Sequence, residues 1–308
     1  MDRIIKNLPG MENLLRCRDL PSFFRPNKQG NSTFESYVDR SRQSLAADAF
    51  ILNSFEDLEG PVLNQIRHHF SKVFTVGPLH HHLITRKTES NQGKEIPRFK
   101  NSIFQVDRSC MTWLDAQPEG SVMYVSFGSS TIVKKEDLME IWQGLVNSKK
   151  RFLWVMRPDI VAGKHNEDEI PTEVKEGTKE RGFIVEWAPQ EEVLAHKAIG
   201  GFLTHSGWNS TLESLVAGVP MICWPYFADQ QINSRFVSEV WKVGLDMKDV
   251  CDRDVVEKMV NDVMVHRRDE FLKSARAIAM LAHKSVSPGG SSYTSLHDLI
   301  EYIKGENN

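Results

Sequence analysis

The residues best suited to ligand chemistry lie between Trp187 and Gln230, where three predicted strands each run into a helix. Ligands of a parallel sheet bind at the carboxyl ends of its strands, so polar side chains at these junctions are expected to converge on one crevice. The groups available there are an indole, an imidazole, amides, hydroxyls and carboxylates. They favour a ligand that combines a flat ring, hydroxyls and an anion.

The central junction offers an anion site. A predicted strand at 201–204 leads to His205 and Gly207, and a glycine at a turn lets the backbone approach a ligand closely. The helix that follows presents free N–H groups and the positive end of its dipole. Asn209 and Ser210 add donors, so a diphosphate is the expected guest. The alternative is that Asn209 and Ser210 only cap the helix.

Two further residues indicate a nucleoside. Glu213 lies one turn after Asn209 on the same helix face, where a carboxylate can accept hydrogen bonds from a ribose diol. Trp187 ends a predicted strand, where an indole can stack on a flat base. Each also has a plain structural interpretation, because Glu213 suits a solvated helix face and Trp187 suits a core.

Polar pairs follow two other strands. Asp229 and Gln230 can grip the vicinal hydroxyls of a sugar, or they can cap a helix. Ser129 lies in a Gly-Ser turn and is a candidate phosphate contact, although such turns are common.

Strands alternate with helices over most of the chain. Leu138, Ile141 and Leu145 mark one face of a helix, and a short apolar run at 49–53 predicts a buried strand. This alternation predicts an α/β fold with a doubly wound parallel sheet. Its predicted strands are 121–127, 152–156, 182–186, 201–204 and 221–224.

Composition narrows the function classes. The 308 residues suggest about two domains. The 38 basic and 41 acidic side chains give a net charge of −3, which argues against a nucleic-acid partner or an anionic membrane. No apolar run approaches the ~18–20 residues of a membrane span. The four cysteines are far apart, which favours free thiols and a cytoplasmic location.

The stretch from Trp187 to Gln230 resembles the signature box of plant family-1 UDP-sugar glycosyltransferases. It carries W-A-P-Q, H-x-G-W-N-S, a glutamate and D-Q in register. The resemblance implies the α/β fold named GT-B, with two Rossmann-like domains. On that basis we expect a complete C-terminal Rossmann-like domain that binds the UDP-sugar and a partial N-terminal one. The expected segments are an N-terminal acceptor-domain remnant at 1–78, an interdomain linker at 79–108, the UDP-sugar domain at 109–286, and a helix at 287–308 that packs back toward the N-terminal domain.

The resemblance also implies a role for each residue of the box. A glutamine at the end of the box is associated in the family with glucose donors, so Gln230 favours UDP-glucose. In these implied roles, Trp187 stacks on uracil, the backbone of Ala188 contacts it, Gln190 lies beside the nucleoside, Glu213 holds the ribose, His205, Asn209, Ser210 and Ser129 hold the diphosphate, and Trp208, Asp229 and Gln230 meet the sugar.

The reaction implied is inverting transfer of glucose to a hydroxyl or carboxyl of a small plant metabolite. Transfer needs a base for the acceptor proton and donors for the charge that grows on the diphosphate. The family's base is a histidine after the first strand of the N-terminal domain, and it has no counterpart here. Met1 aligns with the late part of that domain, so on the order of 150 residues are expected to be absent. We therefore predict no catalytic residue in this chain. It is either part of a longer enzyme or a catalytically inactive UDP-sugar binder.

The acceptor and partners follow from likeness alone. Residues 7–24 and 52–63 resemble family members that glucosylate iridoids such as 7-deoxyloganetic acid, and a flavonoid or another small acceptor stays open. GT-B relatives need no metal, so no metal or cofactor is expected beyond the donor substrate, and the full-length protein is expected to be a monomer. Asp252-Arg253-Asp254 spells a D-x-D, but we predict that Asp252 caps the helix that follows.

Two other enzyme classes share parts of this pattern. A dinucleotide oxidoreductase shares the doubly wound sheet, but no G-x-G-x-x-G or Walker A loop follows a strand. A serine hydrolase using His205 and Ser206 would need a G-x-S-x-G elbow, which the sequence lacks.

Overall fold

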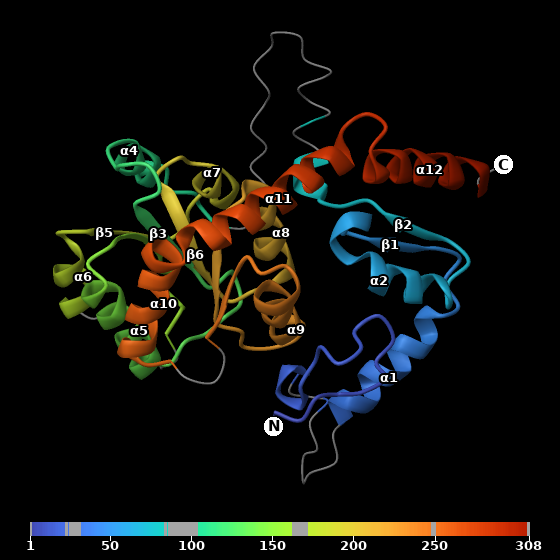
Figure 1. Cartoon of the computed structure of the whole chain (residues 1–308), viewed down its shortest axis with the longest axis horizontal. Helices are drawn as coiled ribbons and strands as arrows, with labels where there is room; N and C mark the ends of the chain where they lie inside the picture. Colours follow the sequence, from blue (N-terminus) through green and yellow to red (C-terminus); the bar gives the residue numbers. More distant parts are fainter. Residues whose placement is uncertain are drawn as a thin grey trace. The chain divides into compact units, whose positions relative to one another are not determined.

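The computed structural model describes residues 2–21, 24, 32–82, 85, 104–161, 172–247 and 251–306. The chain divides into two compact units, shown in Figure 1. One unit combines Met1–Phe99 with Ala277–Asn308, and the other is Lys100–Arg276. Most of the predicted linker at 79–108 lies outside the described residues. Of its described residues, 79–82 and 85 belong to the first unit and 104–108 belong to the second.

The first unit is built on two parallel strands, in which Phe50 pairs with Val73. Its last helix packs on the second strand, because the Tyr302 ring lies 5.7 Å from the Phe74 ring and 3.6 Å from Lys72 Nζ. The strand expected at 49–53 is present as β1, but the expectation that it is buried is wrong, since Ile51 is 53% exposed. The elements of this unit are a 3₁₀ turn (Cys17–Asp19), α1 (Ser32–Ser44), β1 (Phe50–Leu52), α2 (Glu56–Arg67), β2 (Val73–Thr75) and α12 (Ser291–Glu306).

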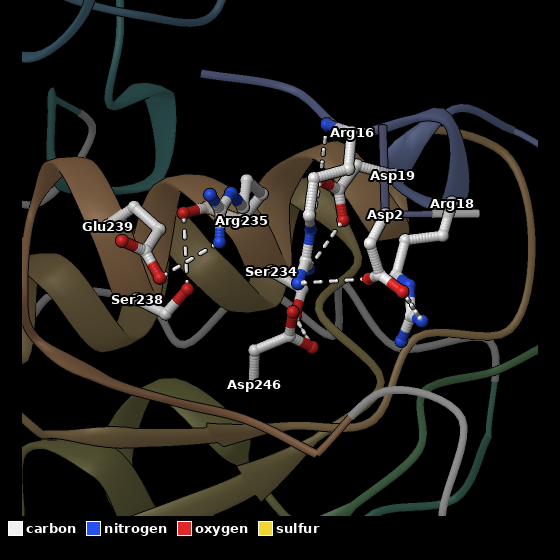
Figure 2. A network of polar contacts seen from close by, with 9 residues as sticks. All are labelled: Asp2, Arg16, Arg18, Asp19, Ser234, Arg235, Ser238, Glu239 and Asp246. Carbon is white, nitrogen blue, oxygen red and sulfur yellow. Dashed lines mark hydrogen bonds and ion pairs between the residues drawn. The ribbon is translucent and has the colours of Figure 1, made fainter. Parts of the chain in front are cut away.

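A cluster of ion pairs ties down the N-terminal segment of this unit (Figure 2). Asp19 is fully buried, and it accepts hydrogen bonds from the backbone N, Nε and Nη2 of Arg16 at 2.7, 3.0 and 2.9 Å. Arg18 pairs with Asp2 at 2.6 Å. A buried carboxylate needs such donors, so Arg16 and Asp19 stabilise a segment that has little regular structure of its own.

The second unit contains a six-stranded sheet whose strands are all parallel. The strand order is β5-β4-β3-β6-β7-β8, so the chain winds one way from β3 and the other way from β6. This confirms the predicted doubly wound α/β fold and places the switch point between β3 and β6. The elements are α4 (Ser109–Asp115), β3 (Val122–Ser126), α5 (Lys135–Asn147), β4 (Arg151–Val155), α6 (Thr172–Thr178), β5 (Gly182–Val185), α7 (Gln190–Leu194), β6 (Ile199–Thr204), α8 (Trp208–Ala217), β7 (Met221–Cys223), α9 (Gln230–Arg235), a π-helical segment (Phe236–Val240), β8 (Gly244–Asp246), α10 (Arg253–Asn261), a second π-helical segment (Asp262–His266) and α11 (Arg268–Val286), which continues into the first unit.

Alternate residues of each central strand face opposite sides of this sheet. Val125 and Leu203 point to the side covered by α5 and α10, where they join one buried apolar cluster. Tyr124 and Phe202 point to the other side and stack with ring centroids 4.9 Å apart. Helices on both faces bury β3, β6 and β7 along their whole length and leave the strand ends as the accessible edge.

At the last strand, the Ser234 hydroxyl of α9 donates to Asp246 of β8 at 2.6 Å (Figure 2).

Among the described helices, none is both long enough and apolar enough to cross a membrane.

Candidate functional site

The start of α8 is the centre of the candidate site. Strand β6 ends at Thr204, and Ser206 takes a positive φ of 64° to turn the chain into the helix. Gly207 is the N-cap residue and makes no side-chain capping bond. Neither Asn209 nor Ser210 is therefore the helix cap, and that interpretation is wrong. The N–H groups of the first turn lack acceptors within the helix, so they remain available to an anion.

His205 lies between two glycine backbones at this turn. A Cβ placed on Gly128 would come within 2.6 Å of the imidazole, and one on Gly207 within 2.5 Å of Nε2. Both positions therefore need glycine to leave room for the ring. Burial, and then the Arg157 cation, lower the pKa of His205 to about 4. At neutral pH the imidazole is uncharged and can act as a hydrogen-bond donor without being a cation.

A partly buried polar network joins α7 to α8. Gln190 Nε2 donates to Glu213 Oε2 at 2.6 Å and to Ser210 Oγ at 2.8 Å. Tyr124 Oη, reaching from β3, donates to Gln190 Oε1 at 3.1 Å. Gln190 therefore orients Glu213 and is fully engaged by protein groups.

Glu213 has an unusual carboxyl group for a helix residue. Burial, opposed by the hydrogen bond from Gln190, raises its pKa to about 7. The carboxylate and the acid are then both populated at neutral pH. A group in that condition accepts hydrogen bonds readily once a ligand supplies hydroxyl donors.

Trp187 follows β5 at the same edge of the sheet. Its indole is half-buried and lies 4.7 Å, centroid to centroid, from the Phe104 ring. Its carbonyl accepts from Asp107 N at 2.8 Å, and the next residue, Ala188, is buried. Gln190 begins α7 only three residues later, so its bond to Glu213 brings the end of β5 beside α8.

The remaining predicted residues are placed as follows. Gln230 is only 3% exposed, and its Oε1 accepts from Tyr226 N and Phe227 N at 2.8 and 3.1 Å. The side-chain oxygen of Gln230 is thus already hydrogen-bonded within the protein, so a sugar would have to accept a hydrogen bond from its side-chain nitrogen. Asp229 is exposed and accepts from Asn233 Nδ2 at 2.8 Å. Ser129 is exposed, and half-buried Trp208 packs near Trp241 at 6.2 Å.

A cavity of about 570 Å³ opens beside Trp187. This cavity was not predictable from the sequence, because one wall is residues 105–108, which fall in the segment predicted to be a linker. Met156 and residues 184–186, at the ends of β4 and β5, form the other wall. None of the predicted donor-binding residues lines this cavity.

Three residues near the site were missed by the sequence analysis. Tyr124 supports Gln190, Phe104 packs on Trp187, and Arg157 donates to the backbone after β3. Only Arg157 carried a local signal, since it is a charged residue directly after an apolar strand. The other two depend on contacts between segments that are far apart in the sequence.

The D-x-D sequence has the structural role expected for it. Asp252 is the N-cap of α10, and its Oδ1 accepts from Val255 N at 2.8 Å. Across the residues that the structure describes, no group of three or more histidine, cysteine or acidic side chains is arranged to hold a metal ion.

Comparison with known proteins decides the family. Residues 102–278, more than half of the chain, match the family model described as UDP-glucoronosyl and UDP-glucosyl transferase. The chain belongs to this family. The resemblance drawn from the signature box is therefore confirmed, and so is the GT-B class of α/β fold.

Relatives in this UDP-glycosyltransferase family include plant enzymes and solved structures. A 7-deoxyloganetic acid glucosyltransferase of Catharanthus roseus is 59% identical, with 99% of this chain and 63% of that protein aligned. A myricetin 3-O-rhamnoside 1,2-glucosyltransferase of Crocosmia x crocosmiiflora is 47% identical over 99% of this chain and 62% of its own. The crystal structure of Os79 from O. sativa in complex with UDP superimposes with a TM-score of 0.82 at 31% identity, covering 95% of this chain and 63% of that one. The chain thus spans about 63% of the length of the first of these relatives.

Proposed function

We propose that this chain is the donor-binding part of an enzyme that transfers glucose from UDP-glucose to a small plant metabolite. The observation that carries the proposal is the Gln190–Glu213 hydrogen bond of 2.6 Å beside the uncapped start of α8. This bond supports Glu213 as the ribose acceptor and the start of α8 as the anion site, and Trp187, three residues before Gln190, as the stacking indole. The unit at 100–276 then corresponds to the UDP-sugar domain, and residues 1–78 to a remnant of an acceptor domain.

Each part of the donor has a proposed partner in this arrangement. Uracil stacks on Trp187 beside the backbone of Ala188, and the ribose hydroxyls donate to Glu213, which Gln190 orients. The diphosphate occupies the start of α8, with His205, Asn209, Ser210 and Ser129 as donors. The glucose lies toward Trp208, Asp229 and Gln230. These are donor-binding roles, and we assign no catalytic base to this chain.

Departure of UDP needs stabilisation of the charge that grows on the diphosphate. A helix N-terminus and uncharged donors can supply this without a bound cation. His205 suits the role because its lowered pKa keeps it neutral. We therefore propose that neither a metal nor a cofactor takes part.

The acceptor is proposed from likeness to the relative at 59% identity, which is named for 7-deoxyloganetic acid. A small iridoid acid is accordingly the first acceptor to try, and a flavonoid is the second.

All four cysteines, namely Cys17, Cys110, Cys223 and Cys251, are free. Free thiols favour a reducing compartment, so we propose action in the cytoplasm. From likeness to the family, we propose that the full-length protein is a monomer.

Calorimetric titration with UDP-glucose, UDP-galactose and ADP-glucose tests the proposal. UDP-glucose should bind best, and ADP-glucose at least about tenfold more weakly, because a purine does not match the uracil position. Equal affinity for UDP-glucose and ADP-glucose would contradict the proposed site. Incubation with radiolabelled UDP-glucose and 7-deoxyloganetic acid then distinguishes an active enzyme from an inactive UDP-sugar binder. Labelled product supports the active enzyme, and binding without product supports the inactive binder.

A further inference from the structure

Arg157 is a buried cation directly behind the turn that follows β3. Its side chain is 2% exposed and lies just past the end of β4. Nη1 donates to Gly128 O at 3.1 Å, and Nη2 donates to Thr131 O at 2.8 Å. A planar guanidinium can span two carbonyls in this way, whereas a single ammonium cannot reproduce its fork.

These two bonds fix both ends of the turn that carries Ser129. Gly128 adopts a positive φ of 73°, and Thr131 is 1% exposed. Ser129, between them, is exposed. The arginine therefore holds the turn from behind and leaves the hydroxyl of Ser129 on the accessible side.

The positive charge of Arg157 is only partly neutralised by a nearby carboxylate. Its one ion-pair partner among the described residues is Asp159, 3.1 Å from Nε, and that carboxylate is 70% exposed to water. The ring of His205 packs on the Gly128 backbone, to which Arg157 donates, and its lowered pKa reflects the nearby cation in addition to burial. The field of the arginine thus reaches the predicted diphosphate position, and burial weakens its screening.

We propose that Arg157 is a positioning residue for the diphosphate of the donor, holding the Ser129 turn in place and supplying positive charge from behind it without touching the ligand. This inference rests on the proposed function. It differs from the roles above because the residue lies outside the signature box and beneath the site.

The test compares UDP with uridine, which lacks the diphosphate. Arg157→Met should lower the affinity for UDP by about tenfold and that for uridine by less than about twofold. Arg157→Lys keeps the charge but loses one carbonyl contact, so an intermediate loss for UDP is expected. Arg181→Met is the matched control, because Arg181 also donates to a backbone carbonyl, that of Val146, but lies before β5 at the opposite edge of the sheet. It should leave both affinities unchanged.

The pKa of His205, followed by NMR, is a readout that a purely structural role would not move. It should rise in Arg157→Met and stay low in Arg157→Lys, since only the first variant removes the charge. If the methionine variant fails to fold, the lysine variant must still lose UDP affinity selectively. Equal losses for UDP and uridine, or no loss, would overturn the inference. Failure of the wild-type chain to bind UDP would instead reject the proposed function.

Discussion

Gln190 Nε2 and Glu213 Oε2 lie 2.6 Å apart, which joins the helix after β5 to the helix after β6. The bond orients the carboxylate from one side and leaves Glu213 Oε1 to meet a ligand. It also brings W-A-P-Q against the glutamate 23 positions later, since the last residue of the motif donates to that carboxylate.

Loss of the supporting amide should weaken donor binding. Gln190→Ala removes the donor to Glu213 and Ser210, so UDP affinity should fall by about fivefold, the equivalent of one hydrogen bond of ~1 kcal/mol. Tyr124→Phe removes only the bond to Gln190 and should cost less. Calorimetry measures both variants, and unchanged affinity in Gln190→Ala would reject the supporting role.

Donor affinity should depend on pH through Glu213. The pKa of this carboxyl is about 7, and the ribose hydroxyls need the ionised form as acceptor. UDP-glucose is the ligand of choice, because its doubly esterified diphosphate keeps a constant charge near neutrality. Its affinity should fall roughly tenfold as the pH drops from about 8 to about 6. In Gln190→Ala the midpoint of this pH profile should move to higher pH, because the hydrogen bond from Gln190 lowers the pKa of Glu213 in the wild type and the variant lacks it. A flat profile in the wild type would contradict the assignment.

The same carboxyl should reduce stability at high pH. Its pKa is raised above the ordinary value of 4.5, so the folded state favours the protonated form. The protonated form therefore contributes stability at low pH, and that contribution is lost as the pH rises through about 7. Glu213→Gln should thus have a higher melting temperature than the wild type at pH 8 and an equal one near pH 4, below the ordinary pKa of the carboxyl. A lower melting temperature of Glu213→Gln than of the wild type at pH 8 would show that the ionised carboxylate does not destabilise the folded state.

Metal removal should not affect donor binding. The described residues hold no cluster of three or more metal-ligating side chains, and Asp252 is engaged as a helix cap. UDP affinity should therefore be the same with EDTA and with magnesium. A loss with EDTA that magnesium restores would point to a cation in the site.

The sequence predicted the parts of this site that depend on local order along the chain. The turn from β6 into α8 and the position of Trp187 at a strand end follow from strand-to-helix junctions. Parallel topology then brings such junctions to one edge, so their proximity was predictable. The short strand β8 was not, because Gly244-Leu245-Asp246 offers a single apolar residue.

What the sequence could not provide are contacts across the sheet. Tyr124 and Gln190 are 66 positions apart, and Arg157 and Gly128 belong to different strand ends. Gln230 adds a contact that its motif did not indicate, since its side-chain oxygen accepts from the backbone of residues 226 and 227, and its sugar contact stays a prediction. Polar groups inside a fold must find partners, and which partner is nearest depends on tertiary packing.

The most direct test of the donor site is calorimetric titration of UDP into the wild type, Trp187→Ala, Glu213→Ala and the control Glu119→Ala. Glu119 is exposed and precedes β3, at the opposite edge of the sheet from Glu213. Trp187→Ala and Glu213→Ala should each bind UDP at least about fivefold more weakly, a loss of ~1 kcal/mol, while Glu119→Ala matches the wild type. Wild-type affinity for UDP in both site variants would contradict the account.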